Sequence, residues 1–267
     1  MKPRANRGVF VAGTDTGVGK TLVTAGLVVA LREMGVDAVP MKPIQTGCVA
    51  QGRRLAAPDL DFSLRVGGLA ASPEELRWMC PYRFQMACSP HLAAARAGVR
   101  IGIAMIRRAF DRLAERHEVV VVEGAGGVLV PLGPAGSMLT LMTSLDLPVV
   151  LVARAGLGTL NHTLLTLNEI RRAGLRVAGL IVNQGEGRGW GTVERDNCGT
   201  LARLGKVPVL ATIRNDRAIA DVTPAAFARF ARKNFRRLFL LRNKGLCETI
   251  HGFPKSRWAA RGAQKGG

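Results

Sequence analysis

The residues with the clearest chemistry form a glycine-containing loop near the N-terminus. An apolar stretch at residues 9–12, typical of a buried strand, precedes the loop, and an apolar-periodic segment, typical of a helix, begins at Lys20 and Thr21. Strand, loop, Gly-Lys-Thr and helix in this order predict a phosphate-binding loop. Its backbone N–H groups would line a concave nest for an anion, and the N-terminal end of the helix would add positive potential.

The residue types of this loop suit a nucleotide and magnesium. Lys20 would reach the outer phosphates, and the Thr21 hydroxyl would ligate the metal. Gly17 and Gly19 would let the backbone approach the phosphates because they have no Cβ. The loop is one residue longer than the common pattern, with Thr14 where that pattern has its first glycine. The loop residues expected to bind the nucleotide are Asp15, Thr16, Gly17, Val18, Gly19, Lys20 and Thr21.

Strands and helices alternate along the rest of the chain. After residues 9–12, apolar strands are expected at 36–41, 118–123, 147–153, 176–182 and 207–211. Helical patterns fall between them, at 59–66, 90–97, 101–116, 159–173 and 193–204, and residues 48–58 read as a loop. This order predicts an α/β fold, a doubly wound and mostly parallel sheet with helices on both faces.

Polar residues follow several of these strands. Lys42 comes after the second strand, Glu123 ends a run of four valines, and Asn183 ends a later strand. Ligands of doubly wound sheets bind beyond the carboxyl ends of the strands, so these side chains are expected beside the phosphate loop. There Lys42 could stabilise the charge of a transferring phosphoryl group or an anionic substrate, and Glu123 could meet magnesium. Asp59 or Asp61 could supply a second acid.

Composition restricts the class of protein. The 267 residues are 48% hydrophobic, which predicts a globular chain with one large core. No apolar run approaches the roughly 20 residues of a membrane span, and the N-terminus lacks a secretory pattern. The five cysteines have no C-x-x-C spacing, which favours structural thiols in a reducing cytoplasm. No nucleophile–base–acid triad is evident, so the chemistry would rest on positioning and electrostatics.

Positive charge is concentrated at the C-terminus. The net charge is +19, and residues 217–267 hold twelve lysines and arginines but only two acids. We expect one nucleotide-binding domain at residues 1–216, followed by a basic helix and tail at 217–267. Residues 227–242 alternate phenylalanines with basic residues, a pattern that suits either a membrane surface or nucleic acid, or a solvated terminal helix, and we favour the solvated helix.

Six motifs follow one another along the chain. They are Gly13-Thr-Asp-Thr-Gly-Val-Gly-Lys-Thr21, Lys42-Pro-Ile-Gln-Thr-Gly47, Ser89-Pro-His91, Val122-Glu-Gly-Ala-Gly-Gly127, Leu157-Gly-Thr-Leu-Asn-His162 and Ala178-Gly-Leu-Ile-Val-Asn183. In order and spacing they resemble the dethiobiotin synthetase family, within the P-loop NTPase superfamily. The resemblance implies a Rossmann-like three-layer fold and a cytoplasmic homodimer. It also implies a ligase dependent on ATP and Mg²⁺ that acts in biotin biosynthesis, closing a ureido ring on diaminopelargonic acid with CO2 or bicarbonate.

The resemblance also implies a set of magnesium ligands. Thr21 and Glu123 match two of the family's ligands. The third matches an acid of the pair Asp59 and Asp61, and the spacing to the downstream Pro-Tyr favours Asp61.

Catalytic and substrate-binding positions are carried over in the same way. Lys20 and Lys42 match the lysines that hold the γ-phosphate and the carbamate, Thr16 and Thr46 match hydroxyls of the substrate site, and Asn183 matches the residue that reads adenine. A loop that reaches the partner subunit's substrate and binds its carboxylate matches Gly156, Leu157, Gly158, Thr159, Leu160 and Asn161.

The closest alternative is a ParA-type or septum-site ATPase, a switch that binds DNA or membrane. That class has an additional lysine early in its phosphate loop, where this chain has Asp15. A corrin amidotransferase would need a glutaminase domain for which the chain has no room. We therefore expect no nucleic-acid or membrane partner. One departure from the resembled family is Arg214, which stands where a proline near the adenine is usual.

Overall fold

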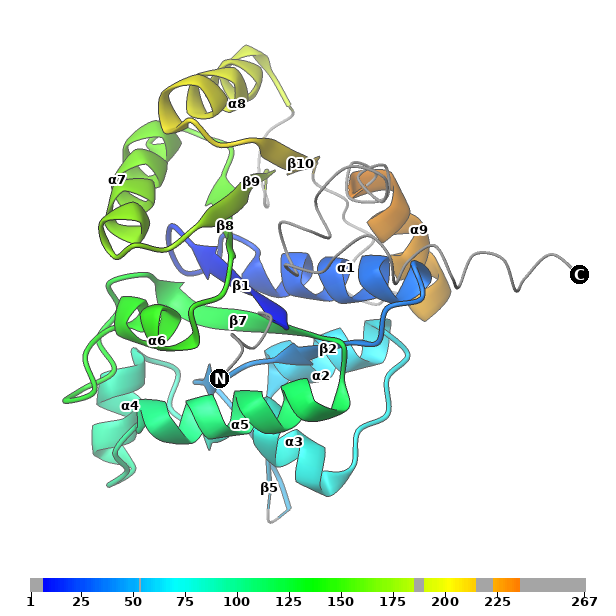
Figure 1. Cartoon of the computed structure of the whole chain (residues 1–267), viewed down its shortest axis with the longest axis vertical. Helices are drawn as coiled ribbons and strands as arrows, with labels where there is room; N and C mark the ends of the chain where they lie inside the picture. The colour runs from blue at the N-terminus through cyan, green and yellow to red at the C-terminus, as the bar shows by residue number, and fades with distance from the viewer. Residues whose placement is uncertain (1–6, 53, 185–189, 215–222, 236–267) are drawn as a thin grey trace, which may run out of the picture.

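A computed structural model describes residues 7–52, 54–184, 190–214 and 223–235. Its centre is a six-stranded parallel sheet with the strand order β10-β9-β8-β1-β7-β2 (Figure 1). These strands are β1 (Gly8–Gly13), β2 (Ala38–Met41), β7 (Val119–Gly127), β8 (Val149–Arg154), β9 (Val177–Asn183) and β10 (Val209–Ile213). The predicted α/β fold is confirmed.

Helices cover both faces of the sheet (Figure 1). One face carries α1 (Lys20–Glu33) and α9 (Pro224–Asn234), and the other carries α5 (Ile103–Arg116), α6 (Met138–Leu145), α7 (Thr159–Arg172) and α8 (Thr192–Gly205). Side chains of β1 alternate between the two cores with the period of a strand. Val9 and Val11 join the core beneath α1, whereas Phe10 and Ala12 join the core on the opposite face. The sequence analysis missed α6.

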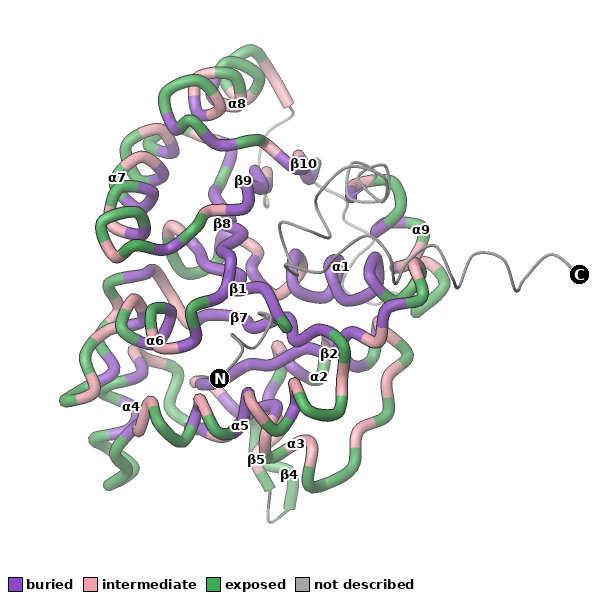
Figure 2. Tube along the Cα trace, viewed as in Figure 1, coloured by how far each residue is buried: buried purple, intermediate pink, exposed green. Residues whose placement is uncertain are grey.

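A smaller group of elements fills the chain between β2 and α5. It comprises β3 (Ile44–Gln45) paired with β6 (Tyr82–Arg83), a hairpin of β4 (Val49–Gln51) and β5 (Arg54–Ala56), and the helices α2 (Pro58–Val66), α3 (Pro73–Met79) and α4 (Pro90–Arg96). The hairpin lies within residues 48–58, which were predicted as a loop. Its side chains are exposed or half-buried (Figure 2), so no buried apolar face marks it in the sequence.

The basic C-terminal helix packs on the domain core. Phe227 and Phe235 are fully buried, with α9 lying against α1 and α2. Phe235 fits against Gly26 of α1, where an added Cβ would lie 2.2 Å from the Phe235 Cε2. The apolar face of this helix is therefore occupied by the core and is not free to contact a membrane or nucleic acid. The predicted domain boundary at residue 217 and the tail at 236–267 lie outside the described residues.

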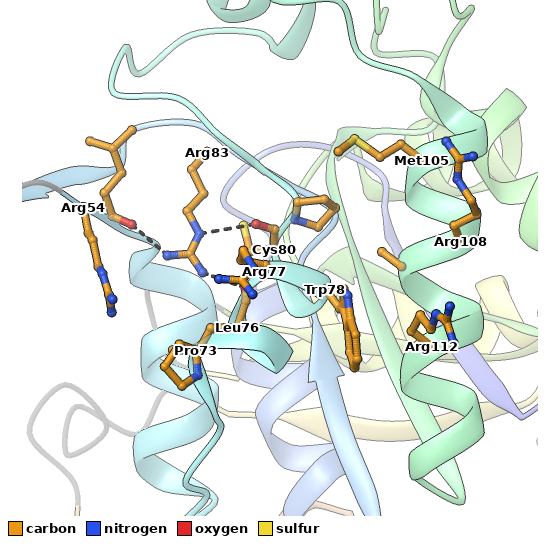
Figure 3. A pocket seen from close by; sticks show the side chains of 13 residues that line it. Arg54, Pro73, Leu76, Arg77, Trp78, Cys80, Arg83, Met105, Arg108 and Arg112 are labelled. Atoms are coloured by element: carbon orange, nitrogen blue, oxygen red, sulfur yellow. Dashed lines mark hydrogen bonds between the residues drawn. The ribbon is translucent and has the colours of Figure 1, made fainter.

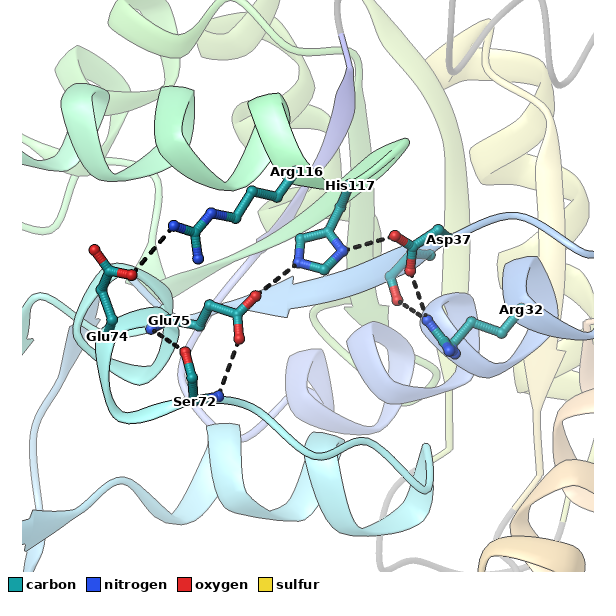
Figure 4. Close-up of polar contacts among 8 residues, drawn as sticks. Arg32, Asp37, Ser72, Glu74, Glu75, Arg116 and His117 are labelled. Carbon is teal, nitrogen blue, oxygen red and sulfur yellow. Dashed lines mark hydrogen bonds and ion pairs between the residues drawn. The ribbon is translucent and has the colours of Figure 1, made fainter.

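A polar network joins α1, α3 and the start of β7 (Figure 4). His117 Nδ1 lies 2.8 Å from Asp37 Oδ2, and His117 Nε2 lies 3.4 Å from Glu75 Oε1. Arg32 donates to the second Asp37 oxygen at 2.9 Å. Ser72 caps α3 in a reciprocal pair with Glu75, and hydrogen bonds from Ser72 lower the pKa of the Glu75 carboxyl. The network connects segments that come from distant parts of the sequence.

The described cysteines are free thiols, which agrees with the predicted structural role. Burial raises the pKa of Cys80 to about 12, so this thiol stays neutral. Within the part of the chain that the structure describes, no helix has the length and apolarity needed to cross a bilayer.

Candidate active site

The predicted phosphate-binding loop joins β1 to α1. Gly17 and Gly19 adopt the left-handed region, with φ of 72° and 98°, which side chains other than glycine rarely adopt. Lys20 is buried and folds back over the loop, donating from Nζ to the Asp15 carbonyl at 2.7 Å. Gly13 leaves room for this path, because an added Cβ would lie 2.9 Å from Lys20 Nζ. The lysine ammonium is thus held over the loop by a backbone carbonyl, and no described carboxylate forms an ion pair with it.

Asn183 contacts this loop from the carboxyl end of β9. It is buried, and its Nδ2 donates to the Val18 carbonyl at 2.9 Å. An added Cβ at Gly19 would lie 2.2 Å from the same nitrogen, so only glycine fits there. Asn183 therefore fixes the backbone of the phosphate loop.

Lys42 lies at the centre of a compact cluster of charged side chains. Its Nζ is 2.6 Å from Glu123 Oε1 and 2.7 Å from Asp59 Oδ2. The Thr21 hydroxyl donates to the same Glu123 oxygen at 2.8 Å. Lys42 and Glu123 are both buried, and Asp59 is half-buried. The carboxyl ends of β2 and β7, the start of α1 and the first turn of α2 meet at this cluster, next to the phosphate loop.

Burial and charge shift the pKa values of these groups. Desolvation, helped by the nearby charge of Lys42, lowers the pKa of Lys20 to about 8. Desolvation also disfavours the charged form of Lys42, but Glu123 and Asp59 outweigh it and raise the Lys42 pKa. Burial raises the pKa of Glu123. For Asp59, desolvation is outweighed by Lys42, so the Asp59 pKa is lowered. Lys42 and Asp59 are therefore a charged pair at neutral pH.

The structure brings Asp59, and not Asp61, to this cluster. Asp61 is exposed, and its described surroundings include the charge of Arg83. Gln45 also contacts this cluster, and the sequence analysis did not single it out. It is buried, and its amide hydrogen-bonds Asp59, which helps to lower the Asp59 pKa. Gln45 stands two residues before the end of the Lys42 motif, and that position is the only sequence signal for it.

Two other loop residues have partners across the site. Asp15 Oδ2 forms an ion pair with Arg154 at 2.8 Å, and Asp15 Oδ1 accepts from the Thr16 backbone at 2.7 Å. The Thr16 hydroxyl approaches β7, where it lies 3.5 Å from a Cβ built on Gly126. Arg154 is the last residue of β8, so its ion pair with Asp15 anchors the exposed side of the phosphate loop to the sheet. Sequence analysis missed Arg154, although its place at a strand end was a signal.

The predicted substrate loop follows β8 and enters α7. Gly158 has a φ of 85° and caps the helix, and Thr159 is buried with its hydroxyl 3.3 Å from that of Thr163. Leu157 is 88% exposed, an unusual position for a large apolar side chain. Half-buried Gly156 and Leu160 and exposed Asn161 complete the loop. Thr46, also half-buried, lies on the separate segment after β3, where its carbonyl accepts from Gln45.

The donor set at the cluster fits magnesium better than a transition metal. Asp59, Glu123 and the Thr21 hydroxyl provide hard oxygen atoms within one small region. Among the described residues, no three His, Cys, Asp or Glu side chains gather as a metal cage. Magnesium suits this arrangement because it commonly takes one or two carboxylates together with phosphate oxygens and water.

Comparison with known proteins places this chain in a family. The family model of the AAA_26 group, described as an AAA domain, matches residues 7–223. The ATP-dependent dethiobiotin synthetase BioD of Anaeromyxobacter dehalogenans is 47% identical over 178 residues, which are 67% of this chain and 77% of that protein. The chain belongs to the ATP-dependent dethiobiotin synthetases. The dethiobiotin synthetase of Clostridium novyi is 35% identical over 212 residues, 78% of this chain and 87% of its own length.

Solved structures of more distant proteins share the fold of this dethiobiotin synthetase family member. The septum site-determining protein MinD of Pyrococcus horikoshii, solved with Mg-ADP, aligns with a TM-score of 0.51 at 18% identity, over 85% of this chain and 95% of that one. A chain of the MinC:MinD cell division protein complex of Aquifex aeolicus aligns with a TM-score of 0.52 at 12% identity, over 85% of this chain and 94% of that one. At these identities the likeness concerns the fold alone.

Proposed function

We propose that this enzyme closes the ureido ring of dethiobiotin on 7,8-diaminopelargonic acid, with CO2 as carbon source and ATP as co-substrate. The products would be dethiobiotin, ADP and phosphate. The observation that carries the proposal is the meeting of Lys20, Lys42 and Glu123 beside a glycine-built phosphate loop, in a chain of the dethiobiotin synthetase family. The two lysine ammonium groups suit a reaction between two anions, and the buried Glu123 carboxylate would hold magnesium beside them.

The proposed reaction has three steps. One amine of the substrate attacks CO2, forms a C–N bond and loses a proton, which gives a carbamate. A carbamate oxygen then attacks the γ-phosphorus of ATP and displaces ADP, which gives a carbamic-phosphoric anhydride. The second amine attacks the carbonyl carbon of this anhydride, loses a proton and expels phosphate, which closes the ring.

The chain's own residues would hold the reactants and lower their mutual repulsion. A carbamate and a triphosphate are both anions, so bringing them together costs energy unless cations lie between them. Lys20 at the mouth of the loop suits the γ-phosphate, and buried Lys42 suits the carbamate. Thr16 and Thr46 would supply hydroxyls to the substrate. Exclusion of water from this pocket would protect the anhydride from hydrolysis.

Magnesium would be held by Thr21, Glu123 and Asp59, and it would neutralise charge on the outer phosphates. We assign the third ligand to Asp59 in place of the expected Asp61, because Asp59 alone of the two contacts Lys42, and it also hydrogen-bonds Thr21. The Lys42 ammonium contacts the carboxylates of both Asp59 and Glu123 in this structure, so these carboxylates would contact Lys42 and the metal at the same time.

We also propose that the enzyme acts as a cytoplasmic homodimer. The exposed Leu157 at the tip of the loop of residues 156–161 is an apolar side chain suited to burial against a second subunit. In that assembly the loop would reach the partner's substrate and bind its carboxylate with backbone N–H groups at the start of α7.

The direct test of the function is release of phosphate from ATP with magnesium and bicarbonate, measured with and without the diamine. We expect release to depend on 7,8-diaminopelargonic acid and dethiobiotin to form in equal amount. Phosphate release that ignores the diamine but rises with DNA or lipid vesicles would instead indicate a switch ATPase of the ParA type.

The lowered pKa of Lys20 predicts that nucleotide binding takes up protons. With a pKa of about 8, Lys20 is about half protonated at pH 8, and a bound phosphate would restore its full charge. We expect uptake of about half a proton per site at pH 8, close to one at pH 9 and almost none below pH 7. Calorimetric titration of Mg-ATP in buffers of different ionisation enthalpy measures this. Lys20→Arg should abolish the uptake because arginine stays charged throughout, and unchanged uptake in that variant would assign the proton elsewhere.

A further inference from the structure

A cavity is lined by residues from the part of the chain between Arg54 and Arg112. It has a volume of about 820 Å³ and opens between α3, α5 and the hairpin strand β5 (Figure 3). None of the residues that line it belongs to the phosphate loop or to the cluster around Lys42. The volume is in the range of sites that hold ligands of nucleotide or cofactor size.

Arginines dominate the polar lining of this cavity. Arg108 and Arg112 extend from α5 on one side, and Arg54 and Arg83 lie on the other (Figure 3). Arg77 of α3 lies between them. Among the described lining residues none is Asp, Glu or Lys. Five guanidinium groups around one cavity create a local positive potential that attracts anions.

Most of these arginines have no carboxylate partner among the residues that the structure describes. Arg83 is fixed in place by donating to three carbonyls, those of Leu55, Leu76 and Cys80, at 2.8 to 3.3 Å. Arg112 has a long ion pair with Glu115 at 3.4 Å on the exposed face of α5. Within the described part of the chain, the side chains of Arg54, Arg77 and Arg108 make no hydrogen bond or ion pair. Three guanidinium groups are therefore free to bind a ligand.

The same cavity has a substantial apolar lining. Leu55, Leu76 and Met105 contribute aliphatic surface, and Trp78 contributes an indole ring. The Trp78 ring is held by Arg116, whose guanidinium carbon lies 4.4 Å from the ring centroid. A free inorganic anion would use only the arginines, whereas a molecule with an organic body would also cover this apolar surface.

The geometry of the guanidinium group indicates which class of anion the cavity favours. A guanidinium presents parallel N–H donors that match two oxygens of one phosphate, whereas a lysine ammonium acts as a point charge. All the cationic side chains that line the cavity are arginines, and they come from different elements around it. This favours a ligand with more than one phosphate group over a single carboxylate.

We propose that this cavity binds a small organic molecule that carries two or more phosphate groups, with the phosphates on Arg54, Arg77 and Arg108 and the organic body against Leu76, Trp78 and Met105. Such a ligand would occupy the enzyme independently of the nucleotide at the phosphate loop. The site does not depend on the proposed ring-closing reaction.

Calorimetric titration of the full-length protein tests the proposal, with adenosine 3′,5′-bisphosphate as probe. The phosphate loop is first saturated with Mg-ADP, so that only a second site is measured. We expect one bisphosphate per chain, and an affinity about tenfold weaker or worse in the double variant Arg77→Ala/Arg108→Ala. Inorganic pyrophosphate titrated in the same way should bind more weakly than the bisphosphate, because it lacks an organic body.

The matched control is Arg96→Ala/Arg203→Ala, which removes the same charge from exposed positions on α4 and α8 outside the cavity. It should change the affinity less than threefold. Arg77→Lys/Arg108→Lys keeps the charge but removes the forked donors, and it should still lose several-fold in affinity. Equal losses in the cavity and control variants would show general surface attraction and overturn the proposal.

Other results would overturn it as well. Absence of one-to-one binding of the bisphosphate means that no site for an organic polyphosphate exists here. If pyrophosphate bound as tightly as the bisphosphate, the apolar side chains of the cavity would not contribute to binding, and the proposed contact with an organic body would be wrong. Tighter binding of a poly-glutamate peptide, lost in Arg77→Ala/Arg108→Ala, would assign the surface to an acidic protein instead. All four substituted side chains are exposed, so the three double variants are expected to fold, and circular dichroism verifies that they do.

Discussion

Lys42→Ala is expected to lower kcat about 10²–10³-fold while leaving the affinity for Mg-ATP within about threefold of the wild type. The ammonium of Lys42 contacts Glu123 and Asp59 and has no contact with the phosphate loop. Its proposed role is to hold the carbamate, so its loss would affect the step in which two anions meet. Steady-state phosphate release with the diamine gives kcat, and calorimetric titration gives the Mg-ATP affinity.

A structural explanation must be separated from this catalytic one. Removing Lys42 leaves two carboxylates without their common cation, and breaking a buried ion pair can cost about 3–5 kcal/mol of stability. Retained Mg-ATP binding at the assay temperature shows that the variant is folded. Lys233→Ala is the control, because it removes the same charge from an exposed position on α9 and should leave kcat unchanged. If kcat and the affinity for Mg-ATP fell together, the role of Lys42 would be to bind the nucleotide and not the carbamate.

Local sequence was sufficient to predict the phosphate loop and much of the cluster around it. Gly17, Gly19 and Lys20 act through backbone geometry and a short reach within one strand–loop–helix unit, which a single stretch of sequence can encode. Lys42 and Glu123 were predicted because parallel strands bring their carboxyl ends to one edge of the sheet. These positions follow from the topology, which the alternation of strands and helices determines.

The choice between Asp59 and Asp61 shows what local sequence could not decide. Two residues along an α-helix differ by about 200° in direction, so only one of these carboxylates can face the cluster. Which one does so depends on the rotation of α2 about its axis, and packing of Leu60 and Leu64 into the core sets that rotation. Spacing to a downstream motif carries no information about rotation, and it pointed to Asp61.

The amphipathic pattern of α9 posed a similar problem. Sequence shows an apolar stripe and a basic face, but it does not show what covers the stripe. In the structure the cover is α1 and α2, where Gly26 provides the space for an aromatic ring and Phe62 meets Phe227 edge-on with ring centroids 5.7 Å apart. Gly26 in α1 indicates a packing site for α9 only when it is considered together with Phe235, which is far away in the sequence.

Phe235→Ala is expected to destabilise the protein by about 3–5 kcal/mol, the usual cost of removing a fully buried phenylalanine. The ring lies against Gly26, and it lies edge-on to Phe230 with ring centroids 6.5 Å apart. Because α1 begins at Lys20, loosening its contact with α9 should also weaken Mg-ATP binding under mild denaturant. Urea denaturation followed by circular dichroism measures the change in the free energy of unfolding.

Two variants make this prediction specific to packing in α9. Phe235→Leu retains most of the apolar volume and should cost clearly less than Phe235→Ala. Arg232→Ala removes an exposed side chain from the same helix, with only a 3.7 Å ion pair to Glu33, and should change stability by less than about 0.5 kcal/mol. If Phe235→Ala were as mild as Arg232→Ala, the C-terminal helix would not be part of the folded core, and the basic segment would again be a separate appendage. A large loss confined to Phe235→Ala would instead show that the contact of α9 with α1, the helix that follows the phosphate loop, belongs to the folded core.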